Sequence, residues 1–263
     1  MAITHPENVS SVKDEFAVRK IDLHDLRVAL AQGWEDFLAK RGDLVFIGFI
    51  YAVVVMLAAV YALSASVLPL LFPLAAGLVL LGPAVASGFY ELARRRELGM
   101  DARWRHFFDV VRSPAAPSLL TLAGLLAFLF VLWILAAWAI FIVTMGPQTY
   151  PSAASFLRAV LTTREGWALL VVGNLVGLGF AILTLAISII SFPMLVDKPV
   201  GWDVAVRTSL RLARENPVTA AAWGLIVVGL LLLGALPALL GLAVVLPVLG
   251  YATWHLYTRA VVR

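Results

Sequence analysis

The chain has 263 residues, of which 62% are hydrophobic and 14% are charged, and its formal net charge is +4. A soluble globular domain has about 25% charged residues, so this composition excludes a soluble protein and indicates a membrane protein with one domain. The absence of cysteine excludes disulfides, thiolate metal sites and cysteine nucleophiles. The pI near 9.6 does not predict a nucleic acid partner, because the basic residues flank apolar stretches, where membrane orientation and anionic lipid explain them.

Four long stretches contain no charged residue, and they are residues 44–90, 113–157, 166–196 and 216–258. A transmembrane helix needs about 20 apolar residues, so each stretch has room for one or two helices. We predict an all-α membrane protein with six transmembrane helices in three hairpins, at about residues 44–63, 70–90, 119–145, 167–191, 218–233 and 239–257. Residues 1–21 are expected to be a polar, flexible segment, and residues 22–263 a single six-span domain.

The distribution of basic residues predicts the orientation of these spans. With six spans, 18 of the 20 lysines and arginines lie in connections on one side of the membrane. Short basic connections stay in the cytoplasm, so both termini are predicted to be cytoplasmic. The first 43 residues have no apolar core of the kind found in a signal peptide, so we expect the first span to target the chain.

A polar stretch with an apolar stripe at helical spacing precedes each predicted hairpin. The stripes are Leu23, Leu26, Leu30, Trp34 and Phe37, then Trp104, Phe107, Phe108 and Val111, then Trp202, Val206, Leu210 and Ala213. Asp22 is the expected N-cap of the first helix, with Asp25 three residues later. We expect three cytoplasmic amphipathic helices that lie in the membrane interface or seal the underside of the bundle.

An internal repeat is predicted from a second set of matches, 164 residues apart. The matches join Gly77, Pro83, Tyr90 and Arg95 to Gly241, Pro247, Trp254 and Arg259. Each unit would consist of a surface helix, a span, a turn and a span. The prolines near the cytoplasmic ends of these spans, including Pro193, predict kinks. A further short surface helix is expected at residues 153–163, with Phe156, Val160 and Leu161 inward.

Few residues within the predicted spans are candidates for a site. One set of small and polar residues is predicted to serve helix packing or, alternatively, a polar path, and it consists of Gly173, Asn174, Gly177, Thr184 and Ser188. His255 lies in an aromatic cluster typical of a membrane interface and is a weak candidate for cofactor binding. The basic cluster of Arg94, Arg95, Arg96, Arg103 and Arg105 is expected to contact anionic lipid headgroups.

No predicted span contains Asp, Glu, Lys or Arg. Ion-coupled carriers, proton pumps and voltage sensors place such groups inside the membrane, so their absence argues against these classes. The sequence has no phosphate-binding glycine loop, zinc-binding histidine pair or serine nucleophile elbow. We therefore expect a protein that is not an enzyme and that binds no metal or cofactor.

Several strings of residues carry a resemblance to a known family. They include Gly33-Trp34-Glu35-Asp36-Phe37, Gly88-Phe89-Tyr90-Glu91-Leu92, Ser191-Phe192-Pro193-Met194-Leu195-Val196-Asp197 and Asn216-Pro217. With them, residues 22–263 resemble the bacterial integral membrane family called domain of unknown function 2189, which implies a bacterial inner membrane protein. Members are sometimes labelled cytochrome c oxidase subunit I. A haem-copper subunit needs about six histidines on its spans, whereas this chain offers one, so the catalytic label does not apply.

The sequence therefore favours a non-catalytic accessory, scaffold or membrane-homeostasis factor, and a place beside a respiratory complex is compatible with it. Its expected partners are membrane lipids and either a membrane protein or a second copy. The alternative is a repeat-built passive or facilitated transporter of small solutes, in which Asn174, Thr184 and Ser188 line the path. A membrane enzyme is the third reading.

Overall fold

The computed structural model describes residues 16–39, 53, 68–147, 150–237 and 239–262. The predicted first span at 44–63 lies outside these residues, except for residue 53. The described residues form helices, and one isolated β-bridge pairs Val18 with Val261. In chain order the elements are a helix at 23–39, η1 (Leu68–Leu70), α2 (Leu71–Leu80), α3 (Gly82–Val85), α4 (Ser87–Glu97), η2 (Trp104–Arg112), α5 (Ala116–Met145), α6 (Ala153–Thr162), α7 (Arg164–Ser188), α8 (Ser191–Asp197), α9 (Trp202–Glu215), α10 (Pro217–Ala235) and α11 (Leu242–Ala260).

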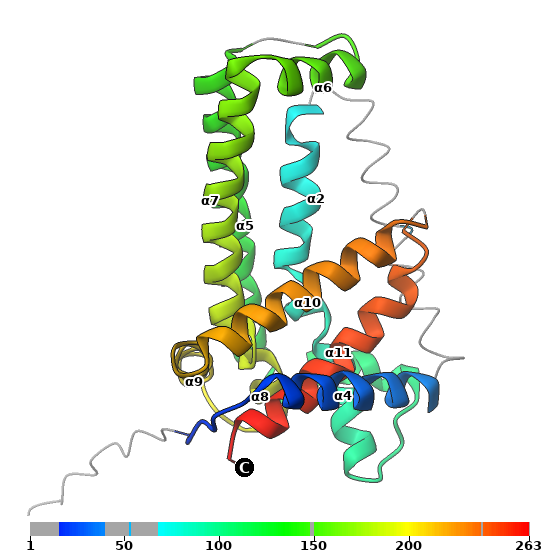
Figure 1. The fold of residues 1–263 in the computed structure, drawn as a ribbon. Helices are drawn as coiled ribbons and strands as arrows, with labels where there is room; N and C mark the ends of the chain where they lie inside the picture. The colour runs from blue at the N-terminus through cyan, green and yellow to red at the C-terminus, as the bar shows by residue number, and fades with distance from the viewer. Residues whose placement is uncertain (1–15, 40–52, 54–67, 148–149, 238, 263) are drawn as a thin grey trace, which may run out of the picture.

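Helices α2, α5 and α7 run side by side, and α6 lies across one end of them (Figure 1). The 30 residues of α5 are apolar on all sides, but only one stripe, including Leu122, Leu126 and Trp133, is buried. On another side Val143 is 85% exposed. A helix that is apolar all round and covered by protein on one side only is suited to lipid. Among the described residues, three helical stretches are long and apolar enough to cross a membrane: Ala116–Met145, Arg164–Asp197 and Pro217–Ala235.

The short helix α6 confirms the surface helix predicted after the third span. Ser152 and Ser155 form a reciprocal capping box at its start, which satisfies two backbone N–H groups. Val160 is buried and Phe156 packs against Phe141, as predicted, whereas Leu161 is exposed and its predicted inward position is wrong.

The predicted span at 70–90 is not one continuous helix. It is divided into α2, α3 and α4, and α4 continues into charged sequence up to Glu97. Pro83 lies at the start of α3, where its missing N–H group is tolerated but cannot extend the preceding helix. The predicted kink at this proline is therefore confirmed, and it is a break between separate helices.

A second break separates α7 from α8, just before Pro193. Ser209 of α9 satisfies the interrupted backbone, because its hydroxyl donates to the carbonyl of Ala186 at 2.8 Å and accepts from the N–H of Ile190 at 3.4 Å. The third proline, Pro247, lies inside α11 without ending the helix. Two of the three prolines thus end helices, and one does not.

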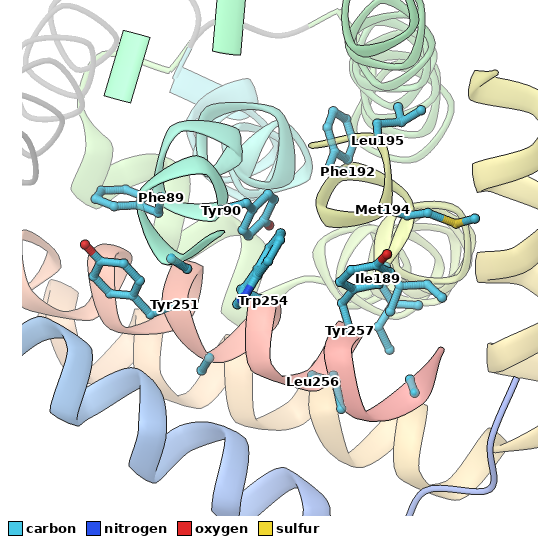
Figure 2. Packing of buried hydrophobic residues seen from close by; sticks show 14 of the residues in the cluster. Phe89, Tyr90, Ile189, Phe192, Met194, Leu195, Tyr251, Trp254, Leu256 and Tyr257 are labelled. Carbon is cyan, nitrogen blue, oxygen red and sulfur yellow. The ribbon is translucent and has the colours of Figure 1, made fainter. Parts of the chain in front are cut away.

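Below the long helices, α4, α8 and α11 pack against one another. We call this region, together with α9, η2 and the helix at 23–39, the base. Figure 2 shows its core, in which the fully buried side chains of Tyr90, Phe192, Trp254 and Tyr257 come from all three helices. Helix α11 covers the predicted sixth span, and most of its residues after Pro247 are buried within the base.

The first amphipathic helix is capped as predicted, because Asp22 and Asp25 accept hydrogen bonds from each other's backbone N–H groups at 2.9 and 3.1 Å. Its buried face differs from the predicted stripe. Of the predicted stripe, Leu26 and Phe37 are buried, whereas Leu23 and Trp34 are exposed. Small residues replace them on the buried face, since Gly33 lies against the backbone of α11. The backbones of this helix and α11 lie so close together that only a small residue such as Gly33 fits between them.

The other two amphipathic segments show the same kind of correction. Residues 104–112 form a 3-10 helix with three residues per turn, so Phe107 and Val110 share the buried face. The other three residues of the predicted stripe, Trp104, Phe108 and Val111, are exposed. Helix α9 buries Ala205, Thr208, Ser209 and Leu212, leaving Val206, Leu210 and Ala213 half-buried and Trp202 exposed.

The two ends of the described chain lie side by side. The backbone N–H of Arg19 donates to the carbonyl of Ala260 at 2.8 Å, next to the Val18–Val261 bridge. The amide of Asn216 binds the same N-terminal segment, accepting from the N–H of Ile21 at 3.0 Å and donating to the carbonyl of Arg19 at 3.2 Å. Residues 16–21 are thereby attached to the junction of α9 and α10.

We predict that Gly33→Ala destabilises the base, because the added Cβ would lie 2.6 Å from the backbone nitrogen of Ala252. Overpacking of this kind costs about 1–3 kcal/mol. The matched control is Gly124→Ala in α5, where an added Cβ meets nothing within 4 Å and alanine is the better helix former. Thermal unfolding in detergent should show a lower midpoint for Gly33→Ala only, and equal midpoints would contradict this packing.

Candidate functional site

The last two turns of α11 bring four side chains to four carboxylates from other parts of the chain. We call these eight residues the hub. The pairs are Trp254 Nε1 with Glu97 Oε2 at 2.9 Å, His255 Nε2 with Asp36 Oδ2 at 2.8 Å, Tyr257 Oη with Asp197 Oδ2 at 2.8 Å, and Arg259 Nη1 with Asp25 Oδ1 at 3.3 Å. The carboxylates belong to α4, α8 and the two ends of the helix at 23–39. The hub therefore joins α11 to α4, to α8 and to both ends of the helix at 23–39.

Asp36 is the most enclosed acid of the hub, being 8% exposed. Its carboxylate meets the Nε of Arg96 at 3.1 Å as well as the Nε2 of His255. A buried carboxylate is costly unless it is paired and hydrogen-bonded, and these two partners meet that requirement. Because Arg96 belongs to α4 and His255 to α11, one carboxylate links three helices.

A second buried acid, Glu91, organises the start of the arginine cluster. Arg94 donates to both of its oxygens at 2.9 Å, and Arg95 donates to Oε1 at 2.7 Å. The hydrogen bonds to Glu91 raise the pKa of Arg94 above its already high value. Arg95 continues to Asp109 of η2 at 2.9 Å, so α4 and η2 are joined by ion pairs. Arg94, Arg95 and Arg96 therefore all bind carboxylates within the protein.

An outer group of charges surrounds the loop between α4 and η2. Partial desolvation alone would raise the pKa of Asp101, but hydrogen bonds from Arg103 and His106 lower it to about 2. The hydrogen bond from His106, helped by the charge of Arg95, lowers the pKa of Asp109. The side chains of Arg103 and Arg105 remain 58% and 57% exposed. These two arginines are the members of the predicted lipid-binding cluster that face outward most.

The residues predicted for helix packing or a polar path on α7 do not share one surface. Asn174 is exposed, and its amide donates to the carbonyl of Leu170 in its own helix at 2.7 Å. Thr184 and Ser188 are buried, and the hydroxyl of Ser188 donates to the carbonyl of Thr184 at 2.7 Å. Gly177 packs against Trp133, whereas a Cβ at Gly173 would meet nothing within 4 Å. The set is therefore divided between the inner and outer sides of α7.

The arrangement of the hub suits attachment more than ligand chemistry. No cluster of three or more His, Asp or Glu that could hold a metal is found among the described residues. The Nε2 of His255, the weak cofactor candidate, is already bound to Asp36. Each described acid of the hub meets a donor from α11. What the hub can do chemically is hold helices together through short, charge-assisted hydrogen bonds.

Sequence reasoning identified His255 and the arginines but missed the acids that bind them. Asp36 and His255 are 219 residues apart, and Trp254 and Glu97 are 157 residues apart. Nothing local distinguishes these acids from solvated charges. One signal was available in the family resemblance, because its strings contain Asp36 and Asp197.

A family model described as "Predicted integral membrane protein (DUF2189)" matches residues 70–197. The match runs from η1 to the end of α8 and thus contains α4, η2 and α8 of the base. It supports the resemblance inferred from the sequence, and its description names neither a bacterial source nor an oxidase. No curated protein and no solved structure matches the chain significantly.

We predict that Asp36→Ala lowers stability by about 1–3 kcal/mol, because Arg96 and His255 both lose a charged acceptor. The control is Glu35→Ala at the neighbouring exposed position, where a change within about 0.5 kcal/mol is expected. Adding His255→Ala to the Asp36→Ala variant should cost less than the same change in the native chain. Thermal unfolding of the native chain, Asp36→Ala, His255→Ala and the double variant measures this coupling, and strictly additive effects would contradict it.

The outer charges should loosen in acid. The folded pKa of Asp101 and Asp109 lies below the ordinary value of 3.8, so their contribution is present above about pH 4 and is lost as the pH falls towards 2. Because the native chain has no cysteine, a fluorophore on Met100→Cys reports on this loop alone. Its anisotropy should fall between pH 4 and pH 2, whereas that of a label on Leu157→Cys in α6 should stay level. An additional Asp101→Asn change should remove most of the pH dependence at position 100.

Proposed function

We propose that this chain, which belongs through residues 70–197 to the predicted integral membrane protein family DUF2189, is a non-catalytic accessory or scaffold protein of a bacterial inner membrane. The observation that carries the proposal is the hub, in which the charged groups of the base bind one another. Groups committed in this way position helices and leave lipid-facing surfaces on α5, α7 and α10 for contact with another membrane component. A place beside a respiratory complex fits such a surface.

We further propose six membrane spans with both termini in the cytoplasm. The bridge between Val18 and Val261 supports termini on the same side. The helix at 23–39 lies in the base, while α2 begins near α6 at the opposite end of α5 (Figure 1). The excess of lysine and arginine on the side of the base favours the cytoplasm for that side.

Anionic lipid is the proposed partner of the base. Arg103 and Arg105 flank Trp104 on η2, and although both pair with Asp101, their side chains are the most exposed of the predicted arginine cluster. Exposed Trp104 and Phe108 are suited to the membrane interface, while each nearby basic group contributes about 1 kcal/mol toward an anionic surface. Arg94, Arg95 and Arg96 act mainly within the protein in this proposal, since their ion pairs with Glu91, Asp109 and Asp36 occupy them.

The rival transporter function requires a continuous polar path. Asn174 faces outward from α7, whereas Thr184 and Ser188 are buried nearer the base. This separation favours the accessory function, because the three polar side chains do not meet within the described part of the chain.

The accessory proposal predicts that the protein, extracted in mild detergent, brings a reproducible membrane protein or lipid set with it. Reconstituted in liposomes, it should show no saturable flux of small solutes, and Asn174→Leu and Thr184→Val should leave the background leak unchanged. Leu225→Ala, on the exposed side of α10, serves as the control variant. A saturable flux that Asn174→Leu abolishes would replace the accessory function with the transporter.

A further inference from the structure

The side chain of Asn174 lies on the outer face of α7, among apolar neighbours. Val171, Leu175, Leu178 and Ile182 are all exposed around it. Asn174 is seven residues from Trp167, where the predicted span begins, which corresponds to about 10 Å along the helix axis. The hydrocarbon core of a bilayer is about 30 Å thick, so this amide lies about a third of the way into it.

The hydrogen bonds within α7 do not satisfy this amide. One of its two N–H groups binds the carbonyl of Leu170 at 2.7 Å. The second N–H group and the Oδ1 oxygen have no partner among the described residues. Lipid chains offer neither a donor nor an acceptor, so an unpaired amide at this depth is unfavourable. A polar group from another helix at the same depth would remove that cost.

We propose that the outer face of α7 is the interface of a parallel homodimer, in which the two Asn174 side chains bind each other. A two-fold axis along the membrane normal places identical residues at identical depth. An asparagine amide carries both a donor and an acceptor, so it complements its own copy reciprocally. A second copy therefore supplies a donor and an acceptor at the same depth in the membrane as Asn174.

The residues around Asn174 permit the close contact that such a pair needs. A Cβ atom built on Gly179 would meet nothing within 4 Å, so the backbone is open beside Leu175 and Ile182. Small residues allow transmembrane helices to approach closely. Gly177, in contrast, is covered by Trp133 within the protein, so it belongs to the internal packing of α5 and α7. The exposed face carries no charged residue between positions 171 and 182, so two copies meet no repulsion there.

The proposal is tested by disulfide crosslinking of the full chain in native membranes, because the chain contains no cysteine. Leu178→Cys lies one turn from Asn174 and is 56% exposed. Leu225→Cys on α10, which is 74% exposed, is the matched control. A disulfide forms only where two Cα atoms come within about 7 Å. We expect a covalent dimer from Leu178→Cys and none above background from Leu225→Cys.

The amide is tested in the Leu178→Cys chain. Asn174→Leu should reduce the crosslinked fraction by about three- to eightfold at low protein density, the factor for one or two interhelical hydrogen bonds. Asn174→Gln, which keeps the donor and acceptor, should retain most of the crosslink. The unfolding midpoint of each variant shows whether the monomer is still folded. If an Asn174 variant does not fold, the comparison of crosslinking at positions 178 and 225 still tests the interface.

Three outcomes would overturn the homodimer. They are equal crosslinking at positions 178 and 225, crosslinking that is unchanged by Asn174→Leu, and an intramolecular disulfide between position 178 and a cysteine placed within residues 44–63. The last outcome would show that the chain's own first predicted span covers this face. None of these results depends on whether a partner co-purifies or a solute is transported, so the homodimer and the proposed function can fail separately.

Discussion

The attachment of α11 to four acids is the interaction on which the base depends. Trp254, His255, Tyr257 and Arg259 extend from less than two turns of helix, so their carboxylate partners on α4, α8 and the helix at 23–39 are brought to one place. Charged and buried groups are stable together only when each has a partner. The hub therefore determines which helix ends meet, and the aromatic core of Tyr90, Phe192 and Trp254 fills the space above them.

The base and the long helices obey different solvation rules. Helices α5 and α7 expose apolar side chains on their outer sides, as lipid permits, whereas the base surrounds an aromatic core and pairs its charged groups, including the buried Asp36 and Glu91. The breaks near Pro83 and before Pro193 lie where the long helices α2 and α7 end and the base begins. A break in a helix frees backbone groups, and Ser209 satisfies them at the second break.

This division relates the structure to function. The titratable groups of the hub are committed to holding helices, which favours a structural contribution to a larger membrane assembly over chemistry at the base. On the outer side of α7, the exposed Asn174 makes one hydrogen bond, to the carbonyl of Leu170 in its own helix. The surfaces that we propose for partners are thus the interfacial edge of η2 and the outer side of α7.

Much of the architecture was determined by local sequence. Charge-free stretches predicted α5, α7 and α10, the Asp22–Asp25 cap predicted the start of the first helix, and motifs predicted the family. Only the tertiary structure decided which side of each helix is covered. Gly33 faces α11 while Trp34 faces outward, and Gly177 faces α5 while Asn174 faces outward. A helix that is apolar on several sides specifies no preferred side, and a pair such as Asp36 and His255, 219 residues apart, exists only after distant helices have packed.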